Sequence, residues 1–267
     1  MRRIALRTVT YPVASHRIPA GFDGIHIAVL ADLHNCRVGG DNRVLLDAVR
    51  ENRPDWILLA GDMITDGIRE VCCDEALHVL RALTEIAPVC YAPGNHEGRW
   101  QEADPDGFAL YRSAAEELGV LFLDNTSTFL RRGEDSLRVT GLSLPQRYYS
   151  KRKRVTATAR DIRALVGAAD SAHYQILLAH TPAFARAYSD WGADLSLAGH
   201  YHGGVIRLPG LGGMISTGFR PFPRYDRGRY RLGEGELIVS AGLGAHTIPI
   251  RVNNPPELVI LKLRGGR

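Results

Sequence analysis

Five short apolar runs constrain this sequence more than any other feature, because each is followed within two residues by Asp, Asn or His, which are residue types that bind metal ions. Runs of this length and composition are typical of buried β-strands. They are Ile27–Ala31 before Asp32, Trp56–Ala60 before Gly61 and Asp62, Val89–Pro93 before Gly94 and Asn95, Ile176–Ala179 before His180, and Leu195–Ala198 before Gly199 and His200. Ligands of α/β sheets bind at the carboxyl ends of strands, so we expect these polar side chains to meet at one edge.

Strand-like runs alternate with amphipathic stretches, which predicts an α/β chain with at least one largely parallel sheet. The expected strands are Ile25–Ala31, Trp56–Ala60, Val89–Ala92, Val120–Leu123, Ser136–Leu142, Gln175–Ala179, Asp194–Ala198, Leu237–Ala241 and Leu258–Leu263. The expected helices are Asp41–Asn52, Glu70–Ile86, Phe108–Leu118, Ala157–Ala169 and Ala183–Trp191, with Asp41 and Thr156 as N-caps. No break in composition divides the 267 residues, so we expect one domain over residues 1–267.

Composition excludes several classes of protein. Apolar residues make up 45% and charged residues 23%, which excludes a disordered, collagen-like or coiled-coil chain. The net charge of +4 permits nucleic-acid binding but does not require it. The four cysteines lack metal-site spacing, and neither a signal peptide nor a membrane-spanning run is seen. We therefore expect free thiols and a cytoplasmic protein, with peripheral membrane contact left open.

The spacing of the polar residues indicates a metal centre. Side chains two positions apart in an extended segment point the same way, so Asp32 and His34 can hold one ion, and so can His200 and His202. Asp62 follows a glycine, which permits a sharp turn, and its carboxylate suits a bridge between two cations. Two cations about 3.5–4 Å apart would clamp a phosphate. An isolated histidine after a strand is usually structural. The prediction of a metal centre rests on the presence of all five strand-end motifs in order along the chain.

This ordered series resembles a known set of motifs. Asp32-x-His34, Gly61-Asp62, Gly94-Asn95-His96-Glu97, His180 and Gly199-His200-x-His202 are similar to the motifs of the calcineurin-like metallophosphoesterase superfamily. Segments Gly203–Pro209, Phe222–Gly228, Gly242–Gly244 and Arg251–Glu257 resemble its YkuE/YaeI-type phosphodiesterase branch. The resemblance implies a four-layer αββα sandwich, two mixed β-sheets flanked by helices. The motifs would occupy residues 32–204, and residues 205–264 would supply C-terminal strands and a substrate loop.

The resemblance also implies a role for each motif residue. It places Asp32, His34 and His202 on one metal ion, Asn95, His180 and His200 on a second, and Asp62 between them. Asp62 and His96 would be the catalytic side chains, with His96 stabilising or protonating the leaving oxygen. The implied reaction is attack by a metal-bound hydroxide on a phosphate ester. We expect Mn²⁺ as the working metal and keep Fe or Zn as alternatives, because sites of mixed nitrogen and oxygen ligands do not choose sharply among these metals.

Two basic stretches are candidates for substrate contact. Residues Phe219–Arg231 alternate arginines, which bind phosphate in a bidentate manner, with aromatic rings. We expect Arg220, Arg224 and Tyr225 to bind an anionic, partly apolar substrate such as a phospholipid or nucleotide-lipid; the alternative is a plain surface loop. The run Lys151–Arg154 could touch acidic lipid or nucleic acid, or form a solvated loop before a helix.

The resulting hypothesis is a dinuclear metal-dependent phosphoesterase, in particular a phosphodiesterase, acting on a small-molecule or lipid phosphoester. One alternative is a nuclease, nucleotide phosphodiesterase or phosphomonoesterase at the same site, which would need a basic groove leading to the metals. Another is a non-catalytic scaffold, which should lack ligands, whereas all seven ligand positions and His96 are present. Arg99 and Trp100 follow His96 closely and could line the site mouth or lie in a simple loop.

Overall fold

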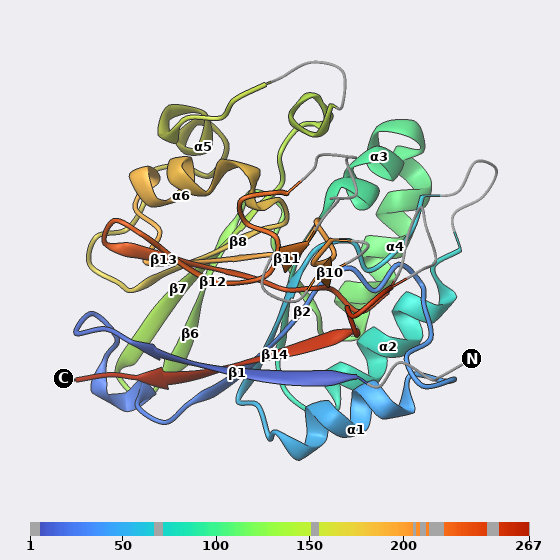
Figure 1. The fold of residues 1–267 in the computed structure, drawn as a ribbon, viewed down its shortest axis with the longest axis horizontal. Helices are drawn as coiled ribbons and strands as arrows, with labels where there is room; N and C mark the ends of the chain where they lie inside the picture. Colours follow the sequence, from blue (N-terminus) through green and yellow to red (C-terminus); the bar gives the residue numbers. More distant parts are fainter. Residues whose placement is uncertain are drawn as a thin grey trace.

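A computed structural model describes residues 6–66, 72–150, 155–204, 207–208, 212–213, 222–244 and 251–266. Two six-stranded β-sheets pack face to face, and helices cover their outer sides (Figure 1). This is the four-layer arrangement of mixed sheets and flanking helices that the motifs predicted. All four cysteines are free, as predicted. No helix among the described residues is long and apolar enough to cross a membrane.

The first sheet has the strand order β1-β14-β2-β3-β4-β5. Its strands are β1 (Arg7–Ala14), β14 (Glu257–Arg264), β2 (His26–Leu30), β3 (Trp56–Ala60), β4 (Val89–Ala92) and β5 (Leu121–Phe122). Strands β2 to β5 are parallel, whereas β14 runs antiparallel to β2 and carries β1 parallel to itself at the edge. Strands β2, β3 and β4 are buried on both faces along nearly their whole length, which explains their almost unbroken apolar sequences.

The second sheet has the order β12-β13-β9-β8-β7-β6. Its strands are β12 (Gly228–Leu232), β13 (Gly235–Val239), β9 (Leu195–Ala198), β8 (Gln175–Ala179), β7 (Asp135–Leu142) and β6 (Ser127–Arg132). The four central strands are parallel, and an antiparallel partner closes each edge. A small antiparallel pair, β10 (Arg207–Leu208) and β11 (Gly212–Gly213), stands apart from both sheets.

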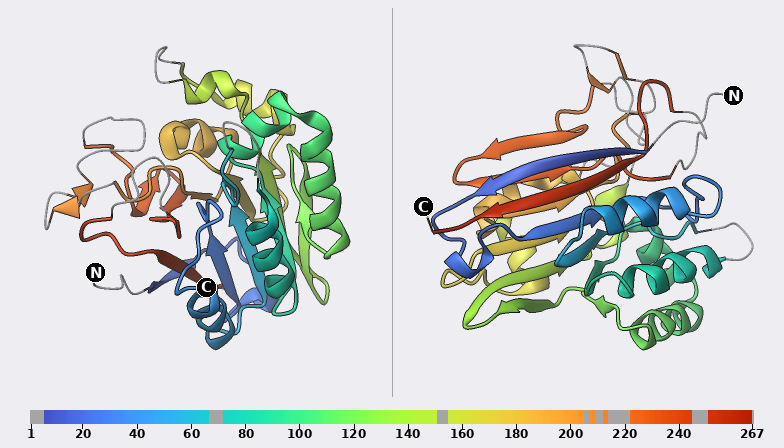
Figure 2. Two further views of the ribbon diagram at one scale, coloured as in Figure 1. Left: turned by 90° about the vertical axis from the view of Figure 1, so that its right-hand side faces the viewer. Right: turned by 90° about the horizontal axis from the view of Figure 1, so that it is seen from below.

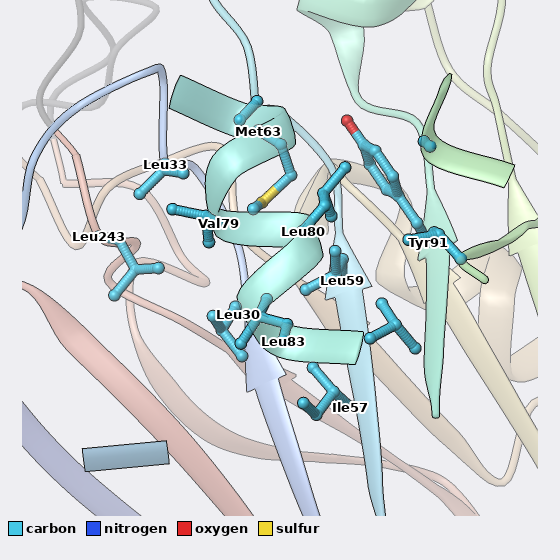
Figure 3. Close-up of a cluster of buried hydrophobic side chains, with 14 of the residues drawn as sticks. Leu30, Leu33, Ile57, Leu59, Met63, Val79, Leu80, Leu83, Tyr91 and Leu243 are labelled. Carbon is cyan, nitrogen blue, oxygen red and sulfur yellow. The ribbon is translucent and has the colours of Figure 1, made fainter. Parts of the chain in front are cut away.

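Side-chain alternation along the strands builds the layers. In β2, Ile27 and Val29 join the apolar cluster between the two sheets, whereas Ala28 and Leu30 face the helices. In β3, Leu58 faces the other sheet, and its neighbours Ile57 and Leu59 pack under α2 with Val79, Leu80 and Leu83 (Figure 3). Each fully buried leucine or isoleucine stabilises the fold by about 1.5–3 kcal/mol, so the two apolar layers fix the strands that carry the polar ends.

The helices divide between the two outer faces (Figures 1 and 2). The first sheet is covered by α1 (Arg43–Glu51), α2 (Asp74–Thr84), α3 (Asn95–Ala103) and α4 (Pro105–Glu117), and the second by α5 (Ala159–Val166) and α6 (Ala185–Trp191). Three short 3₁₀ turns are η1 (Ala20–Phe22), η2 (Gln146–Tyr149) and η3 (Pro182–Phe184). Helix α3 was not predicted, because its sequence is polar and contains Gly98.

Several predicted boundaries are wrong by a few residues. The predicted N-cap Asp41 is replaced by Asn42, which precedes α1 with a φ of 61°. The predicted N-cap Thr156 is replaced by Thr158, whose hydroxyl accepts from the backbone nitrogen of Asp161. Helix α2 begins later than expected, at Asp74. Helix α4 begins earlier than expected, at Pro105, because the side chain of Asp104 caps it. Helix α5 ends before Gly167, whose φ is 79°. The edge strands β1, β6 and β12 were missed, since exposed alternate positions give them a weak apolar pattern.

Candidate metal centre

The predicted ligands lie together where the central strands of both sheets end. Asp32 and His34 follow β2, Asp62 follows β3, and Asn95 opens α3 directly after β4. His180 follows β8, and His200 and His202 follow β9. Most of these side chains are buried, and Asp32, Asp62 and His180 are at most 1% exposed. Two sheets thus contribute to one centre, as the common strand-end position predicted.

One half of the centre is formed by Asp32, His34 and His202, whose potential ligand atoms lie within 4.8 Å of one another. The Nε2 atoms of His34 and His202 are 3.1 Å apart. Nε2 of His202 lies 3.5 Å from Oδ1 of Asp32. Nδ1 of His202 is 3.2 Å from the carbonyl oxygen of Gly244, which directs Nε2 toward the carboxylate. These three residues are the set expected for the first metal ion.

The other half is formed by Asp62, His180 and His200, with Asn95 beside them. Nε2 of His180 lies 2.9 Å from Oδ2 of Asp62 and 3.2 Å from Nδ1 of His200. The amide of Asn95 points at ring nitrogens of His200 and His180, with its oxygen facing these acceptors. Rotated by half a turn, its nitrogen would donate to them at 2.7 and 3.3 Å. A cation among the three side chains would stabilise the oxygen-inward orientation.

Asp62 stands between the two halves. Its Oδ2 lies 2.9 Å from Nε2 of His180 and 3.9 Å from Nε2 of His34, one residue from each half. Its Oδ1 accepts from the backbone nitrogen of His96 at 2.9 Å, which ties the carboxylate to the start of α3. The position suits the bridging role predicted for this residue.

The donors and acceptors of the centre fit a metal better than they fit one another. Nδ1 of His180 lies 2.8 Å from the carbonyl oxygen of Ala60, so this nitrogen carries the proton when the ring is neutral. Its Nε2 lone pair then faces the carboxylate of Asp62, and two acceptors face each other in a buried site. Either a proton or a cation must lie between them. The same reasoning applies to His202, held by Gly244.

The pKa values of the buried groups follow from these contacts. Burial opposes ionisation of Asp62, but the charges of His180 and His96 hold its pKa well below the usual value. Burial raises the pKa of Asp32 to about 7, against the opposing effect of His180. Burial alone would lower the pKa of His180, yet the carboxylates of Asp62 and Asp32 raise it to about 9. Burial and the nearby Arg251 lower the pKa of His202 to about 3, which keeps this ring neutral.

Backbone strain is concentrated at the same residues. Asp32, His34, Asp62, His200 and His202 all have φ between 50° and 68°. They are five of the eleven non-glycine residues with positive φ in the described ranges. Such conformations cost about 1–3 kcal/mol each and persist where the surrounding structure enforces them, most often at functional sites. The turn before Asp62 also needs its glycine, since a Cβ on Gly61 would lie 2.7 Å from Nδ1 of His180.

Comparison with known proteins agrees with this geometry. The family model described as calcineurin-like phosphoesterase matches residues 25–204, which include every candidate ligand. The chain belongs to this family. It is therefore a phosphoester hydrolase of a family that uses divalent metals, and the resemblance predicted from the motifs is confirmed.

Several relatives extend the similarity over most of the chain. It is 26% identical to the uncharacterized metallophosphoesterase YkuE of Bacillus subtilis, covering 97% of this chain and 86% of that protein. It is 27% identical to phosphodiesterase YaeI of Escherichia coli, covering 89% and 81% of the two chains. The solved structure of TT1561 from Thermus thermophilus superposes with a TM-score of 0.50 and 14% identity over 82% and 89% of the chains, which supports the fold.

In this calcineurin-like phosphoesterase, His96 lies beside the centre with its own supporting pair. Its Nε2 is 3.9 Å from Oδ2 of Asp62. Its Nδ1 contacts the carboxylate of Asp66, and Arg99 donates to both oxygens of that carboxylate at 2.6 and 2.8 Å. Burial opposes ionisation of Asp66, but Arg99 and His96 hold its pKa well below the usual value. Arg99 does reach the site, whereas Trp100 packs in the core against Phe108.

The turn at Asp62 is supported by Glu97, a buried residue to which the sequence motifs assigned no role. Glu97 accepts from the backbone nitrogens of Asp62 and Met63 at 3.0 and 2.8 Å. It also accepts from the Tyr91 hydroxyl at 2.6 Å and from the nitrogen of Gly94 at 2.8 Å. The Gly-Asn-His-Glu motif therefore both supplies the candidate ligand Asn95 and anchors the end of the neighbouring strand β3. Its spacing to Asp62 gives no signal of this contact.

The residues predicted to bind substrate have different surroundings. Arg220 and the run Lys151–Arg154 lie outside the described residues. Arg224 is exposed, and its guanidinium lies 5.3 Å from the ring centre of Tyr225. Tyr225 is buried, only 9% exposed, and packs edge-on against Tyr230. Among Arg220, Arg224 and Tyr225, the structure describes a solvent-exposed side chain for Arg224 alone. The substrate-binding role of all three residues stays a prediction.

Proposed function

We propose that this protein is a dinuclear metal-dependent phosphodiesterase. The observation that supports this best is that Asp32, Asp62 and four histidines meet at one place, all but His200 buried, with acceptor atoms facing one another. Asp32, His34 and His202 would hold one ion, Asn95, His180 and His200 the second, and Asp62 both. When bound, such ions neutralise phosphate oxygens and supply a nucleophile at neutral pH. Mn²⁺ is the proposed working metal, because mixed nitrogen and oxygen ligands accept it, with Fe or Zn as alternatives.

The protein's own side chains would then orient the ester and complete proton transfer. Nε2 of His96 lies 3.9 Å from Oδ2 of Asp62, and its Nδ1 contacts the carboxylate of Asp66. We assign His96 to the leaving oxygen as a hydrogen-bond donor and general acid. Glu97 keeps the turn at Asp62 fixed through backbone hydrogen bonds. The name of the YaeI relative supports a diester rather than a monoester substrate.

The proposed substrate is an anionic, partly apolar phosphoester such as a phospholipid or nucleotide-lipid. Phe222 is 60% exposed and Arg224 is exposed two residues later, so an apolar ring and a cation both face solvent within three residues of the chain. Such a pair suits a lipid headgroup and peripheral membrane contact. The four free cysteines favour a reducing compartment, and we propose the cytoplasm.

An activity panel with reconstituted metal tests this function. Metal-stripped protein is loaded with Mn²⁺, Fe²⁺ or Zn²⁺ and assayed on p-nitrophenyl phosphate, bis(p-nitrophenyl) phosphate, cyclic nucleotides, single-stranded DNA and phospholipid vesicles. We expect Mn²⁺-dependent hydrolysis of the diester and loss of activity on chelation. His96→Ala should retain both metals and lose most turnover. Full activity of that variant would remove His96 from the mechanism, and failure to bind any metal would refute the proposal.

A further inference from the structure

Tyr149 is placed beside the second half of the metal centre by a segment that carries none of the motif residues. It ends η2, which follows β7 in the second sheet and docks on the start of α3. The docking contact is a hydrogen bond from Nε2 of Gln146 to the carbonyl oxygen of Asn95 at 3.1 Å. The turn is thus fastened to a predicted ligand residue of the centre.

The ring of Tyr149 forms a wall of this half. Its centre lies 5.4 Å from the His200 ring, in an edge-on arrangement, and 6.4 Å from the His180 ring. Tyr149 is partly exposed, whereas His180 is buried beneath it. An aromatic ring in this position limits the directions from which a substrate can approach the two histidines.

The hydroxyl of Tyr149 is a donor with no acceptor in the described part of the chain. Other tyrosines near the site use theirs: Tyr188 donates to the carbonyl oxygen of Thr181 at 2.8 Å, and Tyr91 donates to Glu97 at 2.6 Å. A phenol carries its proton at neutral pH, so this hydroxyl can donate its hydrogen to an incoming acceptor.

We propose that the Tyr149 hydroxyl donates a hydrogen bond to a non-bridging oxygen of the substrate phosphate, an inference that rests on the proposed phosphodiesterase function. The phosphate would lie beside His200 and His180, where two metal ions would draw an oxyanion. A neutral donor at this place binds an anion without competing with the histidines for metal. Tyr149 is thus a substrate-binding residue, and its ring sets the approach of the ester group.

The test compares Tyr149→Phe with Tyr148→Phe in the Mn²⁺-loaded protein. Tyr148 is a matched control, since it lies in the same turn but packs edge-on against Phe184 at 5.6 Å. The measurements are metal content, the dissociation constant of inorganic phosphate by calorimetry, and KM and kcat for bis(p-nitrophenyl) phosphate. We expect Tyr149→Phe to keep both metals and to weaken phosphate binding and raise KM by about tenfold, with a smaller change in kcat.

Each outcome decides between the two proposals. Equal phosphate affinity in Tyr149→Phe and Tyr148→Phe would overturn the role of Tyr149. Loss of metal from Tyr149→Phe would also overturn it, because the residue would then support the metal ligands rather than bind the substrate. A wild-type protein that binds phosphate but hydrolyses no ester would refute the phosphodiesterase function, while a tenfold weaker phosphate affinity of Tyr149→Phe would still support this inference. A metal-loaded wild type that binds no phosphate would overturn it.

Discussion

The metal centre and the arginine-rich segment 222–231 are both dense in charge, yet their charges are used in opposite ways. In the segment, Asp226 accepts from Arg207 and from the backbone nitrogen of Gly213, each at 2.7 Å, and from the Tyr230 hydroxyl at 2.8 Å. In the centre, the carboxylate of Asp62 faces the lone pair of a histidine nitrogen. The carboxylate of Asp226 is thus satisfied by donors of the protein itself, whereas the facing acceptors of the centre need a cation or a proton between them.

The arginines of the segment support the same contrast. Arg229 donates to the carbonyl oxygen of Pro12 at 2.7 Å and to Glu236 at 2.6 Å. Arg227 lies 3.7 Å from Glu257, which is buried. A run of arginines and aromatic residues therefore does not by itself mark a binding surface; the informative feature is whether each charge already has a partner.

The same substitution in the two regions should have opposite consequences. Asp62→Asn should lower kcat by more than about 100-fold and reduce metal content, because even outer partners of metal ligands are worth about 10–100-fold. Asp226→Asn should retain activity but lower the free energy of unfolding by about 2 kcal/mol, since it weakens a mostly buried ion pair. Metal analysis, turnover and urea unfolding on both variants check this. Loss of activity in Asp226→Asn would break the contrast.

Protons should compete with the metal ion for the side chains of the metal centre. The pKa of Asp32 is raised to about 7 and that of His180 to about 9, so both groups hold protons at pH 6 that a metal must displace. Mn²⁺ affinity should fall as pH falls, by about 100-fold between pH 8 and 6 from His180 alone. Calorimetric titration at several pH values measures it, with circular dichroism to verify folding. An affinity independent of pH would contradict the assigned protons.

The support of His96 should have an intermediate effect. Asp66→Asn removes the charge that contacts Nδ1 of His96 and that Arg99 holds in place. We expect kcat to fall by about tenfold with both metals retained, because the ligands themselves are untouched. The exposed Asp47→Asn is the control. An unchanged kcat in Asp66→Asn would show that His96 does not depend on this carboxylate.

The sequence predicted those parts of the fold that depend on local pattern. Strands β3, β4 and β8 match their predicted ranges, because a run buried on both faces is apolar at nearly every position. The strand-end rule then located the candidate ligands, since parallel strands end at a common edge. Edge strand β1 could not be seen in this way, because its exposed positions give it a mixed pattern and its pairing with β14 joins the two chain ends.

The supporting residues of the site depend on contacts between distant segments. Glu97 bonds to the backbone 34 and 35 residues away, and Gln146 in the turn before Tyr149 bonds to Asn95, 51 residues away. No spacing rule links such positions in a single sequence. A weak signal existed for Asp66, which follows Asp62 by four residues, and for Tyr149, which precedes a basic run. Packing, rather than motif spacing, gives these residues their surroundings.

The smallest predicted effect tests whether any part of segment 222–231 serves the substrate. Arg224 is exposed, unlike the buried Tyr225 beside it. Arg224→Ala should weaken hydrolysis of phospholipid vesicles by about fivefold, since one arginine near a lipid surface is worth about 1 kcal/mol, and should leave a small chromogenic diester unaffected. The exposed Arg231→Ala, in strand β12 of the same segment, is the control. Equal effects of Arg224→Ala on both substrates would remove the case for a lipid-facing role and leave the segment purely structural.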